Sequence, residues 1–378
     1  MGTVLDSLSG DAGNKRRSIF EMLRSEIRSG KYRTVTRFPS ETALARRFGC
    51  SRQSVVHAIM SLEDLGLLYR ERGSGTYLTK KARKYGASIG IILPGIGSTE
   101  IFPIICREIS RLAQQDGLNL LLGGDTSGSA EIQAVNAMDL ARQFVVQKVS
   151  GVFFQPIEFC EKAEEYNRAI ISIFQAAKIP VVLIDCDIAV TPERSDFDVV
   201  GINNFNAGRK LARHMLECGA KRVRFLRKPL CANTVYRRIL GAQTVLRERK
   251  PEDFVVTAEA GDEKAIAAAI RGRDGADAFI CGNDDVASSL LVTLRKLGKR
   301  VPQDILVAGV DDAGRARVVT PSLTTLHQPC EDIARTAFSL LLSRIDNPGL
   351  SPRECMFDAP IVVRESTYRA VASAPRKS

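Results

Sequence analysis

One stretch of the chain, residues 38–78, constrains the fold more than any other. Ser40 and Ser51 each precede a run of helix-forming residues, and Ser is a favoured N-cap because its hydroxyl accepts a hydrogen bond from a free backbone N–H. Gly66 ends the second run, and two short β-rich runs joined by residues 71–75 follow it. This order predicts a winged helix-turn-helix, whose second helix is shaped to enter a DNA major groove.

Positive charge is concentrated around this stretch. Residues 14–84 carry 17 Lys and Arg against six Asp and Glu, a net charge of +11, which equals the net charge of the whole chain. A basic segment that coincides with a helix-turn-helix is the electrostatic footprint expected for DNA phosphates. The rest of the chain sums to zero and has no electrostatic reason to approach DNA.

Three motifs in this stretch follow one another in a familiar order: Phe38-Pro39-Ser40-Glu41, Gly49-Cys50-Ser51-Arg52 and Gly73-Ser74-Gly75-Thr76. With them the chain resembles the GntR family of bacterial transcription regulators. Thr42 stands where the family usually has Arg, and Val56 stands where it often has Arg. Both positions commonly face DNA in that family, so the operator sequence does not follow from the resemblance.

The resemblance also implies which side chains meet DNA. Arg52 and Gln53 are expected to read base edges at the start of the second helix, with His57 helping. Serine hydroxyls, together with Arg46 or Arg47, are expected to hold phosphates, and the wing is expected to contact the backbone or the minor groove. The full expected set is Arg37, Ser40, Thr42, Arg46, Arg47, Ser51, Arg52, Gln53, Ser54, His57, Arg72, Gly73, Ser74, Gly75 and Thr76.

Cysteine usage and hydropathy bound the class of protein. The nine cysteines are scattered, odd in number and free of CxxC pairs, which favours reduced thiols over a disulfide framework or a zinc site. The first residues lack the pattern of a signal peptide, and no apolar run approaches a membrane span. We therefore expect a cytoplasmic protein with no membrane partner, no metal and no cofactor.

From residue 88 onward, short apolar runs alternate with amphipathic helices, and the pattern occurs twice. This is typical of an α/β fold with two doubly wound parallel sheets and a cleft beyond the strand C-termini. The predicted parts are a disordered tail (1–13), the winged helix-turn-helix (14–79), a linker (80–87), an effector-binding and dimerisation domain (88–370) and a tail (371–378). Lobe 1 of that domain is expected over 88–198 and 327–347, and lobe 2 over 199–326 and 348–370.

The second half of the chain contains further motifs: Asn283-Asp284, Val301-Pro302-x-Asp304-Ile305, Gly309-x-Asp311-Asp312, Leu323-Thr324-Thr325-x-x-Gln328 and Arg238-x-x-Gly241. With them, residues 88–368 resemble the effector domain of the LacI family, whose members are similar to periplasmic sugar-binding proteins. The combination with the N-terminal domain is similar to arabinose-repressor-type regulators. The resemblance implies that the chain crosses between the lobes three times.

Polar residues at strand ends form the expected effector site. Asp185, Asn283 and Asp311 each follow a strand, and Arg238 lies on the helix after another strand; in LacI-like proteins the matching positions hydrogen-bond a sugar or a purine. A carboxylate accepts from two hydroxyls and a guanidinium donates to two oxygens, which suits a polyol. Phe102 stands where relatives often place an aromatic ring over the ligand, with ordinary core packing as the alternative. A strand-end Asp can equally be a helix cap or a loop charge.

Together these features predict a homodimeric repressor of sugar-utilisation genes, controlled by a small sugar in the cleft and bound to a palindromic operator. The three histidines lie beside no nucleophile motif, so we do not expect an enzyme. Two alternatives stay open. One is an activator, or a regulator that responds to a sugar phosphate, a purine or a partner protein. The other is an enzyme acting on a sugar or nucleotide with a DNA-binding appendage.

Overall fold

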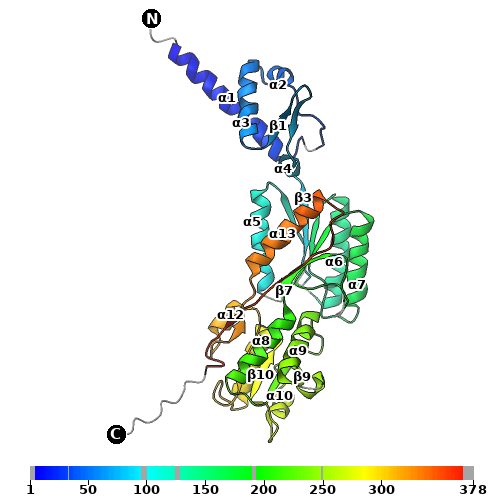
Figure 1. Ribbon diagram of the computed structural model, residues 1–378, viewed down its shortest axis with the longest axis vertical. Coiled ribbons are helices and arrows are strands. Elements are labelled where there is room, and N and C mark those ends of the chain that lie inside the picture. Colours follow the sequence, from blue (N-terminus) through cyan, green and yellow to red (C-terminus); the bar gives the residue numbers. More distant parts are fainter. Residues whose placement is uncertain are drawn as a thin grey trace, which may run out of the picture. The chain divides into compact units, whose positions relative to one another are not determined.

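The computed structural model describes residues 5–32, 34–94, 100–123, 128–189, 193–247 and 250–368. Residues 1–4 and 369–378 lie outside the described residues, and the predicted C-terminal tail (371–378) falls among them. The chain forms two compact units, one made of Met1–Ile89 with Ser110–Leu121 and the other of Gly90–Ile109 with Leu122–Ser378. Figure 1 labels the elements of both units along the chain.

The first unit contains the predicted winged helix-turn-helix. Its elements are α1 (Leu5–Arg28), α2 (Glu41–Phe48), α3 (Arg52–Asp64), the antiparallel pair β1 (Leu68–Glu71) and β2 (Gly75–Leu78), and α4 (Lys80–Lys84). Leu23 and Ile27 of α1 pack with Val55, Ile59 and Leu62 of α3, and each of these side chains is buried. The apolar spacing of both helices therefore forms the core of this unit.

Local capping defines where α2 and α3 begin. The Ser40 hydroxyl accepts a hydrogen bond from Ala43 N at 3.2 Å, and the Ser51 hydroxyl accepts one from Ser54 N at 3.2 Å. Gly49 ends α2 in the left-handed conformation, at φ 58°, which a glycine adopts without strain. The predicted helix starts at Glu41 and after Ser51 are confirmed.

Two expectations for this unit are wrong. Helix α1 begins at Leu5 rather than near Lys15, so residues 5–13 of the predicted disordered tail are helical, and no proline interrupts them. The predicted linker contains the short helix α4, whose first turn is capped by Thr79: its hydroxyl accepts from Ala82 N at 3.2 Å. The linker is therefore structured over 80–84.

The second unit contains two parallel sheets. In lobe 1, five strands lie side by side with every neighbouring pair parallel: β13 (Glu354–Phe357), β7 (Asp198–Ile202), β6 (Val181–Ile184), β5 (Val152–Phe154) and β3 (Ser88–Ile92). Helices α6 (Ala130–Val146) and α7 (Ala163–Ala176) lie on one side of this sheet and α13 (Cys330–Asp346) on the other (Figure 1). Helix α5 (Ile101–Gln115) begins in this unit and ends in the first one, which also holds most of β4 (Asn119–Gly123).

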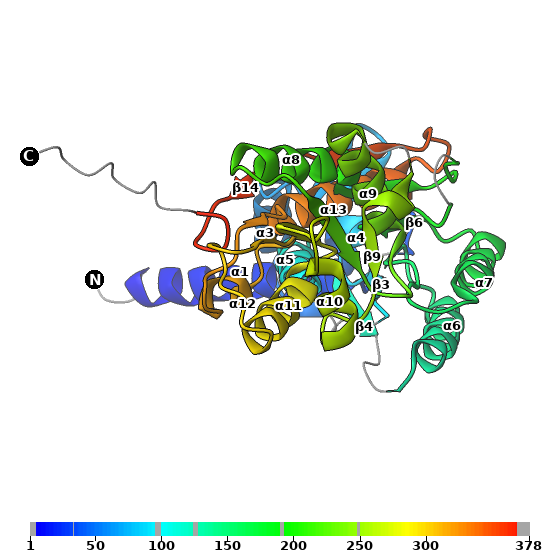
Figure 2. The same ribbon diagram turned by 90° about the horizontal axis from the view of Figure 1, so that it is seen from below.

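Lobe 2 is built on the sheet β11 (Leu306–Ala308), β10 (Ala278–Cys281), β8 (Val223–Arg227) and β9 (Val255–Thr257), again parallel. Its helices are α8 (Asn204–Glu217), α9 (Asn233–Leu246), α10 (Glu263–Ile270), α11 (Asp284–Lys296) and α12 (Gly314–Val318), with the 3-10 turn η1 (Pro251–Asp253). A small antiparallel pair, β12 (Thr325–Leu326) with β14 (Ile361–Val362), completes it. Figure 2 shows these helices from below. No helix in the described residues is long and apolar enough to cross a bilayer.

The boundary between the lobes differs from the expected one. Strands β7 and β13 belong to the sheet of lobe 1, so the chain first crosses after Ile202 rather than at residue 199. The Asp198 carboxylate is buried in lobe 1, where it accepts from Arg344 Nη2 of α13 at 2.9 Å and from Arg353 N at 2.8 Å. The predicted return of helix 330–345 to lobe 1 is confirmed, because α13 packs on β5, β6 and β7.

Candidate nucleic-acid interface and effector cavity

Helix α3 exposes the side chains expected to read bases. Val55 and Ile59 are buried, whereas Gln53 and His57 are exposed and the Arg52 side chain is 72% exposed. Thr42 on α2 is exposed as well. The helix therefore presents a polar face to solvent, as a recognition helix requires.

Glu41 holds Arg52 in place, a relationship that the sequence did not reveal. Arg52 Nε lies 3.0 Å and Arg52 Nη2 2.9 Å from Glu41 Oε2, while Arg70 Nη2 of β1 lies 3.1 Å from Glu41 Oε1. Arg70 also pairs with Glu63 at 3.0 Å. Glu41 thus joins α2, α3 and the wing. Its partners are 11 and 29 positions away in the chain, so no local spacing indicates the contact.

The structure separates the two arginines that were expected to share one role. Arg47 Nη1 donates to Glu26 Oε2 at 2.9 Å and to the Tyr32 hydroxyl at 3.0 Å, and its guanidinium lies 4.7 Å from the Phe48 ring centroid. The hydrogen bond from Arg47 is the main reason why the pKa of Glu26 falls to about 2. Arg47 is therefore tied to α1, and the exposed Arg46 is the better candidate for a phosphate contact.

Two glycines shape the tip of the wing. Gly73 has φ 77° and Gly75 has φ 137°, both in the region that favours glycine. A Cβ on Gly75 would lie 2.1 Å from Arg37 Nε, so Arg37 lies against the wing at Gly75. The Ser74 hydroxyl is 2.5 Å from the Tyr77 hydroxyl, and Arg72 is exposed. Arg37, Arg72 and Ser74 thus lie on or beside one hairpin.

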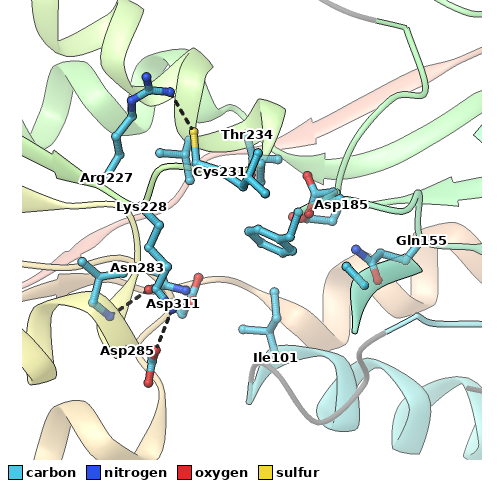
Figure 3. Close-up of a pocket in the computed structure, with 18 of the residues that line it drawn as sticks. Ile101, Gln155, Asp185, Arg227, Lys228, Cys231, Thr234, Asn283, Asp285 and Asp311 are labelled. Atoms are coloured by element: carbon cyan, nitrogen blue, oxygen red, sulfur yellow. Dashed lines mark hydrogen bonds and ion pairs between the residues drawn. The ribbon is translucent and has the colours of Figure 1, made fainter. Parts of the chain in front are cut away.

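The five predicted effector residues line a single cavity of about 470 Å³ in the second unit, namely Phe102, Asp185, Arg238, Asn283 and Asp311. This volume falls in the range of small-molecule sites. Figure 3 shows side chains from both lobes around it, with Asp185 and Gln155 on one side and Asn283 and Asp311 on the other. Phe102, in the first turn of α5, is buried and also lines the cavity, so core packing and ligand contact coincide in this residue.

Close packing of α8 on α9 positions Arg238. A Cβ on Gly208 would lie 1.8 Å from the carbonyl oxygen of Arg238, and one on Gly241 would lie 1.9 Å from that of Phe205. The backbones can approach this closely only because both residues are glycines. The buried guanidinium is oriented by two hydrogen bonds, from Nε to Asn204 Oδ1 at 2.8 Å and from Nη1 to the Gly282 carbonyl at 2.6 Å.

The two aspartates lie in the left-handed region, at φ 73° for Asp185 and φ 124° for Asp311. Both are strained positions for a residue with a Cβ, which is common at functional sites. Asp311 Oδ1 accepts from Gln328 Nε2 at 2.8 Å. Burial raises the pKa of Asp311 to about 6 and also raises the pKa of Asp185. The charge of the Arg238 guanidinium opposes both increases without cancelling them.

Asn283 has a structural role as well. It is the N-cap of α11, and its Oδ1 accepts from Val286 N at 3.0 Å. Its side-chain oxygen is thereby engaged, which leaves its amide nitrogen as the group to offer a ligand. The next residue, Asp284, is buried behind the cavity, where its carboxylate accepts from Thr325 Oγ1 at 2.6 Å and from Ala313 N at 3.0 Å.

Sequence reasoning missed other residues of the cavity. Gln155, Glu158 and Gln328 line it, and of these only Gln328 belonged to a recognised motif. Gln155 directly follows β5 and Glu158 comes three residues later, so the strand-end rule that selected Asp185 could have selected them. Asp312, in contrast, lies outside the cavity. It pairs with Arg364 and with His327 Nδ1, the latter at 3.1 Å.

Two family models match separate parts of the chain. Residues 15–78 match the family described as bacterial regulatory proteins, gntR family, and residues 212–367 match the periplasmic binding protein-like domain. The chain is 29% identical over 299 residues to the HTH-type transcriptional repressor PurR of Escherichia fergusonii, a match that covers 76% of this chain and 81% of that protein.

Solved structures share the fold. A transcriptional regulator CelR–cellobiose complex has a TM-score of 0.62 and 18% identity, over 87% of this chain and all of that one. A LacI family regulator from Enterococcus faecalis with bound ribose has a TM-score of 0.60 and 23% identity, over 74% and 98%. The chain is therefore similar to transcriptional regulators: residues 15–78 match the gntR family model, and residues 212–367 match the periplasmic binding protein-like model.

Proposed function

We propose that the protein is a homodimeric repressor of carbohydrate-utilisation genes whose operator binding is modulated by a small sugar. The observation that carries the proposal is the convergence of Asp185 from lobe 1 with Arg238 and Asp311 from lobe 2 on one cavity. Carboxylates and a guanidinium in fixed orientations are suited to a ligand that carries several hydroxyls. The solved relatives with cellobiose and with ribose support this class of ligand.

The DNA-binding part of the proposal rests on α3 and the wing. In a homodimer, two copies of α3 would lie in successive major grooves of a palindromic operator, about 10 bp apart. Arg52 and Gln53 would read base edges, with His57 beside them. Arg46 and the serines would meet phosphates, and the wing from Arg72 to Thr76 would contact the backbone or the minor groove.

A ligand can act on DNA binding only through a difference in affinity between two conformations. A sugar between the lobes would favour one arrangement of the lobes and so change the register of the two DNA-binding heads. Such coupling is typically ~1–3 kcal/mol, and it is reciprocal, so that DNA changes sugar affinity by the same factor.

Titration of the promoter region upstream of its own gene, at one fixed salt concentration, tests the assignment of α3. We expect Arg52→Ala to lose specific binding. Arg168→Ala is the matched control, because the Arg168 side chain is also 72% exposed but lies on α7 in an i,i+4 pair with Glu164. Intact specific affinity in the Arg52 variant would refute the recognition helix.

A thermal-shift screen with pentoses, hexoses, their phosphates and purines tests the cavity, since a true ligand stabilises the protein in proportion to its excess over Kd. We expect Asp311→Asn to remove the shift and the effect of the ligand on DNA binding. Asp304→Asn, which changes a surface pair with Arg300, is the control. An unchanged response in the Asp311 variant would place the site elsewhere.

A further inference from the structure

The cavity has an excess of negative groups. Glu158, Asp185 and Asp311 all line it, and the Cys186 thiol donates to Glu158 Oε1 at 3.6 Å, which places Glu158 beside the segment that carries Asp185. In the part of the chain that the structure describes, none of these three carboxylates forms an ion pair. Carboxylates that lie together without a cation repel one another, and a positively charged ligand would remove this repulsion.

The cations of the same cavity are engaged elsewhere. Arg238 directs Nε to Asn204 and Nη1 to the Gly282 carbonyl. Lys228 pairs with Asp285 at 3.5 Å. Arg227 donates to Thr257 Oγ1 at 3.1 Å and to Cys231 Sγ at 3.4 Å. The charge of Arg238 lowers the pKa of all three carboxyl groups, but its hydrogen bonds go to Asn204 and Gly282 rather than to a carboxylate.

The cavity also has buried hydrogen-bond acceptors without donors. Gln155 Oε1, Asp185 Oδ1 and Gln328 Oε1 have no hydrogen-bond partner, and their residues are 3%, 9% and 2% exposed. Each such atom lacks a hydrogen-bond donor from the protein, and a donor on a ligand would satisfy it. A phosphate offers acceptors and negative charge, whereas an ammonium group offers three donors and a positive charge.

We propose that the effector is a small polyol that carries a protonated amine, with the ammonium group between Glu158 and Asp185 and its hydroxyls donating to Gln155, Asp311 and Gln328. This inference rests on the proposed function of the cavity as the effector site, and adds the charge of the ligand. The proposal favours an amino sugar over a sugar phosphate, because a phosphate group would place an anion against three carboxylates.

The pKa values of Glu158 and Asp185 reflect their surroundings. Burial, and then the neighbouring Asp185, raises the pKa of Glu158 to about 8, and burial raises that of Asp185. Of the groups that face Glu158, Asp185 raises its pKa, whereas the hydrogen bond from the Cys186 thiol, the charge of Arg238 and the backbone of Asn233 lower it. A bound cation would lower the pKa values of Glu158 and Asp185 further.

Isothermal titration of the full-length protein with matched sets of ligands tests the proposal. Each set contains one sugar in a positively charged, a neutral and a negatively charged form. The first set is D-glucosamine, D-glucose and D-glucose 6-phosphate, and the other two sets are the same three forms of galactose and of mannose. In the best-binding set we expect the amine to bind about 10-fold more tightly than the neutral sugar, because charge-assisted hydrogen bonds are about twice as strong as neutral ones. The phosphate is expected not to bind. Equal or tighter binding of a neutral or phosphorylated member, or no binding by any amine, overturns the proposal.

Two variants link the preference to the carboxylates. Glu158→Gln and Asp185→Asn are each expected to reduce the ratio of amine to neutral affinity about 10-fold, and Asp304→Asn is expected to preserve it. If Asp185→Asn does not fold, the affinity ratio of the Glu158→Gln variant alone tests the proposal. A ratio that is unchanged in a folded Glu158→Gln protein contradicts the assignment.

Binding of spermidine, a polyamine without hydroxyl groups, distinguishes a polyamine effector from an amino sugar. We expect it to bind at least 10-fold more weakly than the best amino sugar, because its methylene groups cannot donate to the glutamine oxygens; the reverse order overturns the polyol part of the proposal. Failure of the proposed function would look different. The protein would then bind no operator, whereas a wrong ligand charge leaves operator binding intact together with a response to a neutral sugar.

Discussion

Gly117 lies so close to Tyr85 that a Cβ on the glycine would be 1.8 Å from Tyr85 Cδ1. Tyr85 is also part of the buried core of the winged helix-turn-helix, and the next residue donates from Gly86 N to the Gly117 carbonyl at 2.8 Å. The segment after α4 is therefore packed against the turn that follows α5 within the first unit, rather than being a free tether. This contact gives the segment a defined conformation.

The first prediction concerns this contact. Gly117→Ala should destabilise the protein more than Gly219→Ala. Both glycines have positive φ, 69° and 87°, so both variants incur backbone strain, but a Cβ on Gly219 meets nothing within 4 Å. The difference, from forcing a side chain into packed atoms, should be about 1–3 kcal/mol in chemical denaturation. Equal losses in the two variants would show that the Tyr85 contact contributes nothing.

The second prediction concerns Glu41. Glu41→Gln should weaken the hold on the Arg52 guanidinium and remove a negative charge near the DNA face. Affinity for the operator should therefore fall relative to affinity for unrelated DNA, by about 5- to 10-fold in their ratio, or ~1–1.4 kcal/mol. Competition titrations at one salt concentration measure this ratio. Glu63→Gln is the control, since Glu63 pairs with Arg70 but not with Arg52; an equal loss in both variants would argue against a role for the Glu41–Arg52 pair.

The third prediction concerns the contact between α8 and α9. Gly208→Ala places a Cβ 1.8 Å from a backbone oxygen, which cannot move as a flexible side chain does. We expect a loss of about 1–3 kcal/mol in stability and a weaker response to ligand, because α9 must shift and carry the Arg238 guanidinium with it. Gly261→Ala, where a Cβ meets nothing within 4 Å, should have little effect. Normal ligand affinity in a folded Gly208 variant would refute the positioning role.

The fourth prediction concerns pH. Hydrogen bonding from Arg47 lowers the pKa of Glu26 from 4.5 to about 2. A depressed carboxyl pKa means that the stabilisation is full above pH 4.5 and is lost as pH falls from 4.5 to about 2. Hydrogen exchange of α1 and α2 amides in the full chain, corrected for intrinsic rates, should show this loss, and Arg47→Ala should flatten it.

Arg300→Ala is the control for this pH dependence. It removes a similar pair, in which Arg300 lowers the pKa of Asp304 to about 2, but this pair lies in lobe 2. The pH response of α1 and α2 should therefore be unaffected by it. If the stability of the winged helix-turn-helix does not change between pH 4.5 and 2, the Glu26–Arg47 pair contributes no stability.

Local features were predictable from the sequence because their causes lie within a few residues. The N-caps at Ser40 and Ser51 start α2 and α3, since each hydroxyl needs only a backbone N–H three residues later. Alternating apolar runs and amphipathic helices predicted the parallel sheets for the same reason. Strand ends converge at one edge of each sheet, and the resemblance to the LacI family implies that the two edges face a common cleft, so the sequence predicts Asp185 and Asp311 at one cavity.

Contacts between distant residues were decided only by the tertiary structure. The pairing of β7 with β13 places Asp198 in lobe 1, and it depends on a strand more than 150 positions later. Glu41 with Arg52 and Arg70, Arg47 with Glu26, and Glu158 beside the Asp185 segment likewise have no local spacing that signals them. Sequence alone thus determined the kinds of elements, their order and the class of protein. The fold determined which charges are paired and which are left for a ligand, because pairing and burial depend on neighbours that the chain brings together only when it folds.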